Sequence, residues 1–134
     1  KSNRSHDMTD LQYWLALLDD DSSKNRMIAA QHLGNTGDPD VIPLLIHAAQ
    51  DNSVTVARTA MLALGKIGGD AVTSTLLEAL EHDNVWVRRA AVQALGTARV
   101  QDVAPILVNA LGDPELHMLA REALKSLHVD PDYF

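Results

Sequence analysis

Histidine and acidic side chains are the first candidates for chemistry here, because a chain without cysteine has no thiolate for catalysis or metal binding. The six histidines are His6, His32, His47, His82, His117 and His128. None belongs to an H-x-x-x-H or H-E pair, and no two have the spacing of metal ligands. Glu81 and His82 form only the reversed pair, which we interpret as a solvated helix end. The sequence therefore predicts no metal, no cofactor and no catalytic residue, and it favours a protein without enzyme activity while leaving that activity open.

Glycine-rich and acidic segments also lack catalytic patterns. Neither G-x-S-x-G nor a phosphate-binding G-x-x-x-x-G-K is present, and GNTGDPD and GKIGG are predicted to be turns. The acidic run at residues 19–21 lacks the spacing of a calcium loop and is expected to be a solvated, helix-capping corner. His32 falls on the core side of its predicted helix, where we expect a buried ring with a local hydrogen bond.

Arginine and tryptophan are better candidates, as binding residues. Arg58 and Arg89 lie 31 residues apart, and Trp86 lies three residues before Arg89. A guanidinium group presents fork-shaped donors that suit carboxylates, and tryptophan and arginine are frequent hot-spot residues of protein interfaces. Whether these residues share one surface depends on the elements that carry them.

The chain is built from repeats. The dipeptide Leu-Gly occurs at 33–34, 64–65 and 95–96, always 31 residues apart, and a fixed period of this size indicates a repeat protein. The aligned copies are residues 20–34, 51–65, 84–96 and, after a shortening by two residues, 113–125.

Each copy has the apolar periodicity of a helix, which follows an Asp, Asn or Ser suited to an N-cap. In the second copy the apolar positions are Val56, Ala60, Ala63, Leu64 and Ile67. We predict that the leucine of each Leu-Gly pair packs the last helical turn. The glycines at 34, 65 and 96 are predicted to end their helices as left-handed C-caps.

A second apolar stretch precedes each of these helices. These stretches are residues 9–19, 40–50, 70–82 and 102–112. Asp40 and Asp102 are predicted N-caps, which would place Pro43 and Pro105 at the third helical position. The sequence therefore predicts a right-handed all-α solenoid of about four two-helix repeats.

Residues 83–96 (DNVWVRRAAVQALG), followed by a short turn and PILVNAL, resemble the short HEAT-like repeats first described in phycobilisome lyase subunits. The resemblance covers residues 9–127 and implies that the arginine after the valine ties neighbouring repeats through acidic turn residues. That arginine is present as Arg88 and Arg26, but Ala57 and His117 replace it in the other copies. The final glycine of the pattern is replaced by Lys125, as expected for a capping repeat.

The repeats suggest a division of the chain. We expect a flexible segment at residues 1–8, a HEAT-like domain at 9–127 and a C-terminal tail at 128–134. The expected repeats are 9–36, 37–67, 68–98 and 99–127. The chain does not begin with Met, so it could be a domain of a larger protein.

The second helices line the concave side of such superhelices, so their outward positions form the candidate binding surface. At about 100° per residue, positions 24, 27 and 31 lie opposite the core, and the repeat interval extends this stripe. The predicted partner-binding residues are Met27, Arg58, Leu62, Trp86, Arg89, Gln93 and Met118. The alternative is structural: Trp86 lies flat over the next repeat, and the arginines pair with Asp83 or Asp113.

Composition excludes other classes of function. With 18 acidic and 11 basic residues the formal net charge is −7, which disfavours nucleic acid as a partner. No apolar run approaches the roughly 18 residues of a membrane span, and no signal peptide is recognisable. We therefore expect a soluble, cytoplasmic protein.

Two functions remain. The first is a non-catalytic interaction or scaffold module that holds an acidic or amphipathic segment of a protein partner on its concave face. The second, implied by the resemblance, is a subunit like the bilin lyases, acting on a phycobilin chromophore and its carrier protein. In that case Arg58 and Arg89 would face the propionates of the chromophore, and Trp86 would line the groove.

Overall fold

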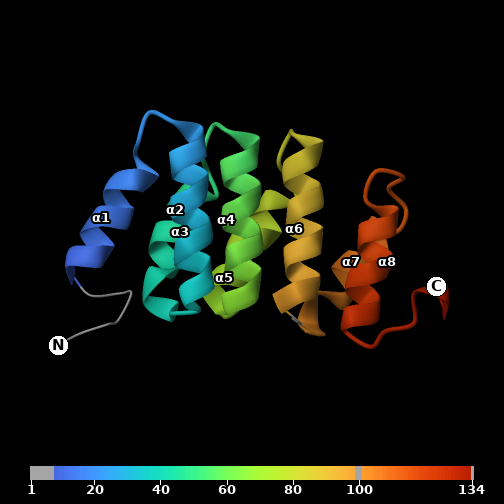
Figure 1. Cartoon of the computed structure of the whole chain (residues 1–134). Coiled ribbons are helices and arrows are strands. Elements are labelled where there is room, and N and C mark those ends of the chain that lie inside the picture. The colour runs from blue at the N-terminus through green and yellow to red at the C-terminus, as the bar shows by residue number, and fades with distance from the viewer. Residues whose placement is uncertain (1–7, 99–100, 134) are drawn as a thin grey trace.

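The predicted all-α solenoid is confirmed by the computed structural model, which describes residues 8–98 and 101–133. The described residues form eight α-helices, arranged as four consecutive helical hairpins (Figure 1). The helices are α1 Met8–Leu18, α2 Ser23–Thr36, α3 Ile42–Ala48, α4 Val54–Ile67, α5 Asp70–Ala79, α6 Val85–Ala98, α7 Ala104–Ala110 and α8 His117–Ser126. Three short 3₁₀ segments accompany them: Pro39–Val41, Gln101–Val103 and Pro131–Tyr133.

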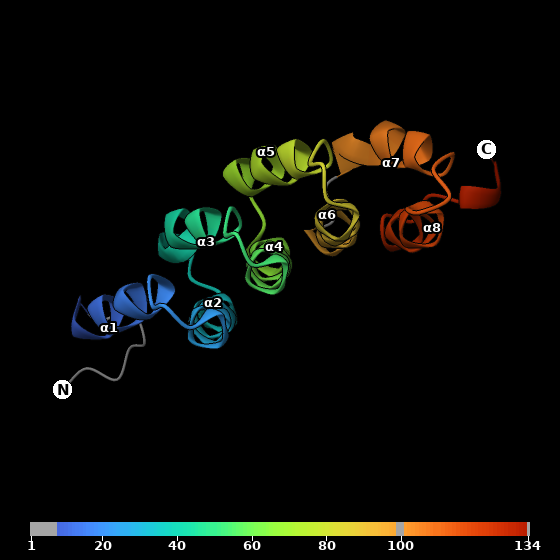
Figure 2. The ribbon, with the colours of Figure 1, turned by 90° about the horizontal axis from the view of Figure 1, so that it is seen from above.

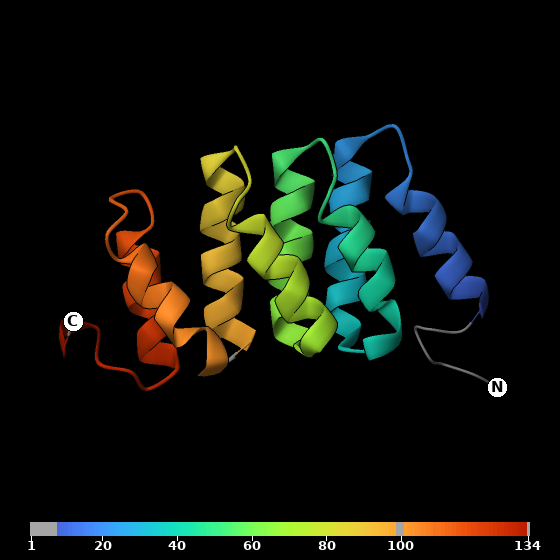
Figure 3. The same cartoon turned by 180° about the vertical axis from the view of Figure 1, so that it is seen from behind.

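The hairpins stack into two curved rows. Figure 2 shows α1, α3, α5 and α7 in an outer row on the convex side, and α2, α4, α6 and α8 in an inner row on the concave side. Seen from behind, the shorter outer helices cross in front of the inner ones (Figure 3). Within the inner row, α2 packs on α4, α4 on α6 and α6 on α8.

The core lies between the two rows and has the period of the sequence. The leucine of each copy is fully buried, as predicted, and the shortened fourth copy keeps its leucine in the same environment: Leu33, Leu64, Leu95 and Leu124 are each 0% exposed. The predicted N-caps also form, since the hydroxyl groups of Ser22 and Ser53 accept hydrogen bonds from the N–H groups of Asn25 and Val56. These caps fix where α2 and α4 begin.

The prediction that the repeated glycines end their helices is wrong. Gly34, Gly65 and Gly96 are buried inside helices that continue for two more residues, to Thr36, Ile67 and Ala98. The left-handed residue that follows α2 is Gly37, with a φ of 67°.

The repeated glycines instead let neighbouring inner helices approach closely. A Cβ built on Gly65 would lie 2.8 Å from the carbonyl oxygen of Ala94, and one on Gly96 would lie 2.7 Å from the Cα of Ala123. A Cβ on Gly34 would meet the Cβ of Ala63. In the fourth copy Lys125 takes the place of the glycine, and its side chain is exposed.

The predicted caps of two outer helices are wrong as well. Asp40 and Asp102 lie within 3₁₀ segments, so Pro43 and Pro105 are the second residues of α3 and α7. Asp38 caps the 3₁₀ segment before α3, since its side chain accepts a hydrogen bond from the Asp40 N–H at 2.9 Å, whereas α3 itself has no side-chain cap. The tight 3₁₀ turn buries Val41 before the α-helix begins.

The C-terminal tail folds back on α8. Arg121 Nη1 donates to Asp132 Oδ1 at 2.7 Å, and Pro131 is buried. At the N-terminus we predict a flexible segment at residues 1–8. Apart from Met8, this segment lies outside the described residues. The domain and repeat boundaries remain proposals.

Candidate partner-binding face

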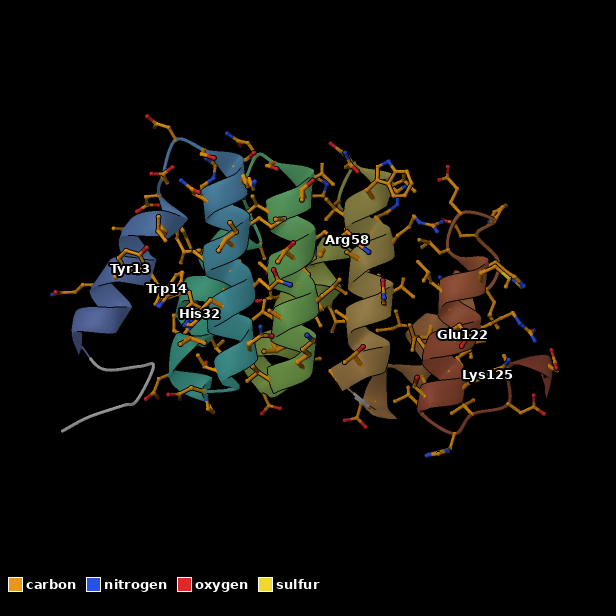
Figure 4. The ribbon with its side chains drawn as sticks, in the orientation of Figure 1. Tyr13, Trp14, His32, Arg58, Glu122 and Lys125 are labelled. Atoms are coloured by element: carbon orange, nitrogen blue, oxygen red, sulfur yellow. The ribbon has the colours of Figure 1, made fainter. Side chains whose placement is uncertain are left out.

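We call the solvent side of α2, α4, α6 and α8 the inner face. The predicted partner-binding residues belong to these helices, and Figure 4 labels one of them, Arg58. Arg58 and Gln93 are exposed on it, and Trp86 and Met118 are the most exposed of its large apolar side chains, at 58% and 66%. Met27 and Leu62 are half-buried and pack against the core. Of the predicted residues, the well-exposed apolar side chains therefore lie on α6 and α8. Ile28, which is 40% exposed on α2, was not among the predicted residues.

Trp86 and Arg89 form a fixed pair. The guanidinium carbon of Arg89 lies 5.5 Å from the centre of the indole ring, which is the geometry of a cation–π contact. Arg89 Nη1 also donates to the backbone carbonyl of Glu115 at 2.6 Å, which ties α6 to the turn before α8. The predicted acceptors, the carboxylates of Asp83 and Asp113, are not used by Arg89. A backbone carbonyl carries no signal in the sequence, so this acceptor could not have been found there.

Arg58 has the opposite character. It occupies the position on α4 that Arg89 occupies on α6, but it is exposed and has no hydrogen bond or ion pair with any described residue. Its position in Figure 4 is on the inner face, in front of the core. Because its donors are not engaged within the described chain, Arg58 is available to a carboxylate of a ligand.

The neighbouring inner helices are tied along the edge that carries the turns before them, the upper edge in Figure 1. Arg26 Nε and Nη2 donate to the carboxylate of Asp51 in the next repeat, at 2.8 and 3.2 Å. Arg88 Nη2 lies 3.5 Å from Glu115 Oε1. Both arginines thus connect repeats as the resemblance implied, and the second repeat, with Ala57 in this position, has no such connection.

The ion pair of Arg26 shifts the titration of its partner. Burial by itself raises the pKa of Asp51, but hydrogen bonds from Arg26 and from the Ser53 N–H, together with the charge of Arg26, outweigh burial and hold this pKa below its usual value. A carboxyl group whose pKa is depressed by folding stabilises the folded state above the pKa of the unfolded chain, and this stabilisation is lost in acid.

Aromatic side chains cover the first repeat. The ring of His32 is half-buried and stacks on Trp14 at 3.9 Å, and Trp14 in turn meets Tyr13 edge to face (Figure 4). The predicted local hydrogen bond of a fully buried His32 is therefore wrong. The first inner helix described is α2, and Trp14 of α1 covers the ring of His32 on it.

The residues considered for metal binding are used in turns. Over the described part of the chain, no three histidine or acidic side chains gather where they could hold a metal ion. His82 is exposed, and its Nδ1 accepts the N–H of Asn84 at 3.0 Å in the turn before α6. Asp20, from the acidic run, accepts hydrogen bonds from the Ser22 N–H and the Asn25 side chain, as a capping corner would.

No described helix is both long and apolar enough to cross a membrane.

The stacked hairpins and the ties between them define a helical-repeat protein, and sequence comparison assigns its family. Residues 11–91 and 73–128 match the family described as HEAT repeats, so the chain belongs to this family. The comparison with curated proteins gave no match.

Two of the solved structures that are similar to this chain show the range of the likeness. One is the complex of CpcE and CpcF of phycocyanin lyase from Nostoc sp. PCC7120, with a TM-score of 0.72 and 26% sequence identity, over 87% of this chain and 52% of that one. This chain thus spans about half the length of that relative. The other is human deoxyhypusine hydroxylase in complex with glycerol, with a TM-score of 0.47 and 19% identity, over 96% of this chain and 66% of that one, a likeness too weak to indicate function.

Proposed function

We propose that this protein is a non-catalytic HEAT-repeat module that binds a segment of a partner protein on its inner face. The observation that carries the proposal is the exposed guanidinium of Arg58, which has no partner among the described residues, on the helix next to the one that carries Trp86. An exposed arginine beside an exposed tryptophan suits a segment with both carboxylate and apolar side chains.

The inner face has the dimensions of a peptide site. Its four helices, spaced about 8–10 Å apart, span roughly 27 Å between the outermost axes. An extended segment of about eight residues covers that distance. Trp86, at 58% exposure, can bury on the order of 100 Å² against such a segment, which corresponds to about 2–3 kcal/mol of apolar burial.

The segment should carry acidic groups over the first half of the array, α2 and α4. Arg58 lies on α4 and Lys24 is exposed on α2, whereas the exposed side chains of Glu115 and Glu122 bring negative charge to the α8 end. Charge complementarity therefore favours a segment whose carboxylates face α2 and α4 and whose apolar side chains face Trp86 and Met118.

A second candidate function is that of a bilin-lyase-like subunit. The observation that favours it is the likeness to the phycocyanin lyase complex, at 26% identity and a TM-score of 0.72. In this case Arg58 would bind a propionate of a bilin, and the indole of Trp86 would lie against the tetrapyrrole. Arg89 would contribute through Trp86, since its Nη1 already binds the carbonyl of Glu115.

Capture from a lysate of the source organism tests the first proposal. The baits are the wild type, a Trp86→Ala/Arg58→Ala double variant, and an Ile106→Ala control, which removes an exposed apolar side chain (39%) from the outer helix α7. A partner retained by the wild type and the control but lost by the double variant supports the inner face. Equal capture by all three contradicts it.

Absorption spectroscopy separates the two functions. The wild type and the double variant are each mixed with a bilin, and the visible spectrum is recorded. A band shift with the wild type that is lost in the double variant supports the lyase-like function. An unchanged spectrum in both contradicts it and leaves the peptide site as the function of this face.

A further inference from the structure

The turns before the inner helices contain a repeated hydrogen-bonding position that is filled in three of the four repeats. Arg26 Nη1 donates to the carbonyl oxygens of Asp20 and Asp21, at 2.6 and 3.1 Å. These carbonyls lie six and five residues before the arginine. Because they belong to a turn and not to a helix, they have no backbone donor among the described residues and are left to a side chain or to water.

The third repeat uses the same two carbonyls, and the fourth uses the first of them. Arg88 Nη1 donates to the carbonyl oxygens of His82 and Asp83, at 2.8 and 2.9 Å, again six and five residues earlier. In the fourth repeat His117 takes over this role, with Nδ1 2.8 Å from the carbonyl oxygen of Leu111. A nitrogen donor therefore occupies the position in each of these three repeats.

The second repeat presents the same two carbonyls without a donor. Its side chain at this position is the methyl group of Ala57, and no described residue donates a hydrogen bond to the carbonyls of Asp51 and Asn52. The space that an arginine would fill is open, since a hollow of about 280 Å³ is lined by Ala57, by both carbonyl-bearing residues and by His82.

The sequence changes on both sides of this hollow together. Asp51 receives Arg26 from the repeat before it. The corresponding residue one repeat later is His82, and the repeat before His82 has Ala57 in place of the arginine. His82 does not replace the lost donor, because its Nδ1 is occupied by the Asn84 N–H. An adjoining hollow, which shares His82 in its lining, also contains the exposed carboxylate of Glu78. The site is thus rich in acceptors, and the part of the chain that the structure describes places no arginine in it.

We propose that this hollow, which we call the repeat-2 pocket, binds the guanidinium group of an arginine side chain from a partner protein. The planar group would donate to the carbonyls of Asp51 and Asn52 in the way that Arg26 and Arg88 donate to theirs. A lysine ammonium is a compact, strongly hydrated charge and does not match this planar pair of acceptors, so the pocket selects arginine. The site lies on the turn edge and is independent of the inner face.

A titration of the ¹⁵N-labelled protein with N-acetyl-arginine methylamide tests the proposal. We expect saturable amide shifts at Asn52, Ser53 and Asn84, and an affinity at least tenfold weaker for N-acetyl-lysine methylamide. Absence of saturable shifts around the repeat-2 pocket, or equal affinity for both probes, would overturn the proposal. This titration of the wild type needs no variant to fold.

Two matched variants locate the site. Ala57→Arg supplies the missing side chain from within the chain, so we expect it to raise the melting temperature and to abolish the shifts. Thr55→Arg adds the same charge on the exposed side of α4 and should bind the probe like the wild type. If Ala57→Arg is folded by circular dichroism and still binds the probe with wild-type affinity, the assignment is wrong.

Free L-arginine and agmatine distinguish a partner side chain from a small metabolite. Both carry the guanidinium group but differ from a peptide residue at the other end. Tighter binding of the blocked arginine than of either small molecule supports a partner protein. Equal or tighter binding of free arginine or agmatine overturns that assignment in favour of a metabolite site.

Discussion

Replacing Gly65 with alanine tests the close approach of the inner helices. The added Cβ would lie 2.8 Å from the carbonyl oxygen of Ala94 and 3.1 Å from its Cα, so α4 and α6 must move apart by several tenths of an ångström. Overpacking of this kind costs about 1–3 kcal/mol, and the better helix propensity of alanine returns about 1 kcal/mol. Because the contacted atoms are backbone atoms that cannot rotate away, we place the overpacking cost in the upper half of its range, about 2–3 kcal/mol, and expect a net loss of about 1–2 kcal/mol.

Chemical denaturation and thermal melting measure this loss, with an expected decrease in melting temperature of about 4–8 °C. In the companion variant Gly34→Ala, the added Cβ would mainly meet the methyl group of Ala63. The double variant Gly34→Ala/Ala63→Gly should therefore recover most of the stability that Gly34→Ala loses. Gly65→Ala/Ala94→Gly should not recover it, because the carbonyl oxygen stays in place. A Gly65→Ala protein as stable as the wild type, or a failure of the Ala63→Gly rescue, would refute this explanation of the repeated glycines.

Three further predictions concern the core, the inner face and the turn edge. Leu64→Ala, at a fully buried position, should cost about 2–5 kcal/mol in chemical denaturation, and a loss below about 0.5 kcal/mol would contradict the packing of α4. Trp86→Ala should change the free energy of unfolding by less than about 1 kcal/mol, and a larger loss would make Trp86 a structural residue. Asp51→Asn should be less stable than the wild type at neutral pH. Since folding depresses the pKa of Asp51, this difference should shrink as the pH falls below about 4, and a difference independent of pH would exclude the Arg26 ion pair as its cause.

The repeat architecture was predictable because the signals for it are local and recur four times. The buried leucines and the serine caps are properties of one helix and its first turn, so one sequence shows them. The function of the glycines was not predictable in this way. A glycine near a helix end fits both a left-handed cap and a close contact between helices, and only the position of Ala94 in the next repeat decides between them.

The same limit applies to the candidate site. Arg58 and Arg89 are equivalent in the sequence, and the prediction treated them alike. In the structure Arg89 donates to a backbone carbonyl of Glu115 in the turn before α8, whereas the equivalent turn before α6 brings no acceptor to Arg58. Half-burial of Met27 and Leu62 likewise depends on how neighbouring helices pack. The periodicity of the helices predicts that these residues share one face. Which of their side chains remain exposed and without a hydrogen bond depends on contacts between repeats.

Site-specific photo-crosslinking tests most directly whether the inner face is the binding surface. A benzophenone amino acid is introduced at Gln93, exposed on α6, or at Ser74, exposed on the outer helix α5, and adducts formed in a lysate of the source organism are identified by mass spectrometry. The account predicts a defined protein adduct from position 93 that is lost when Arg58 is also changed to alanine, and no such adduct from position 74. The same adduct from position 74, or one from position 93 that survives the loss of Arg58, would contradict it.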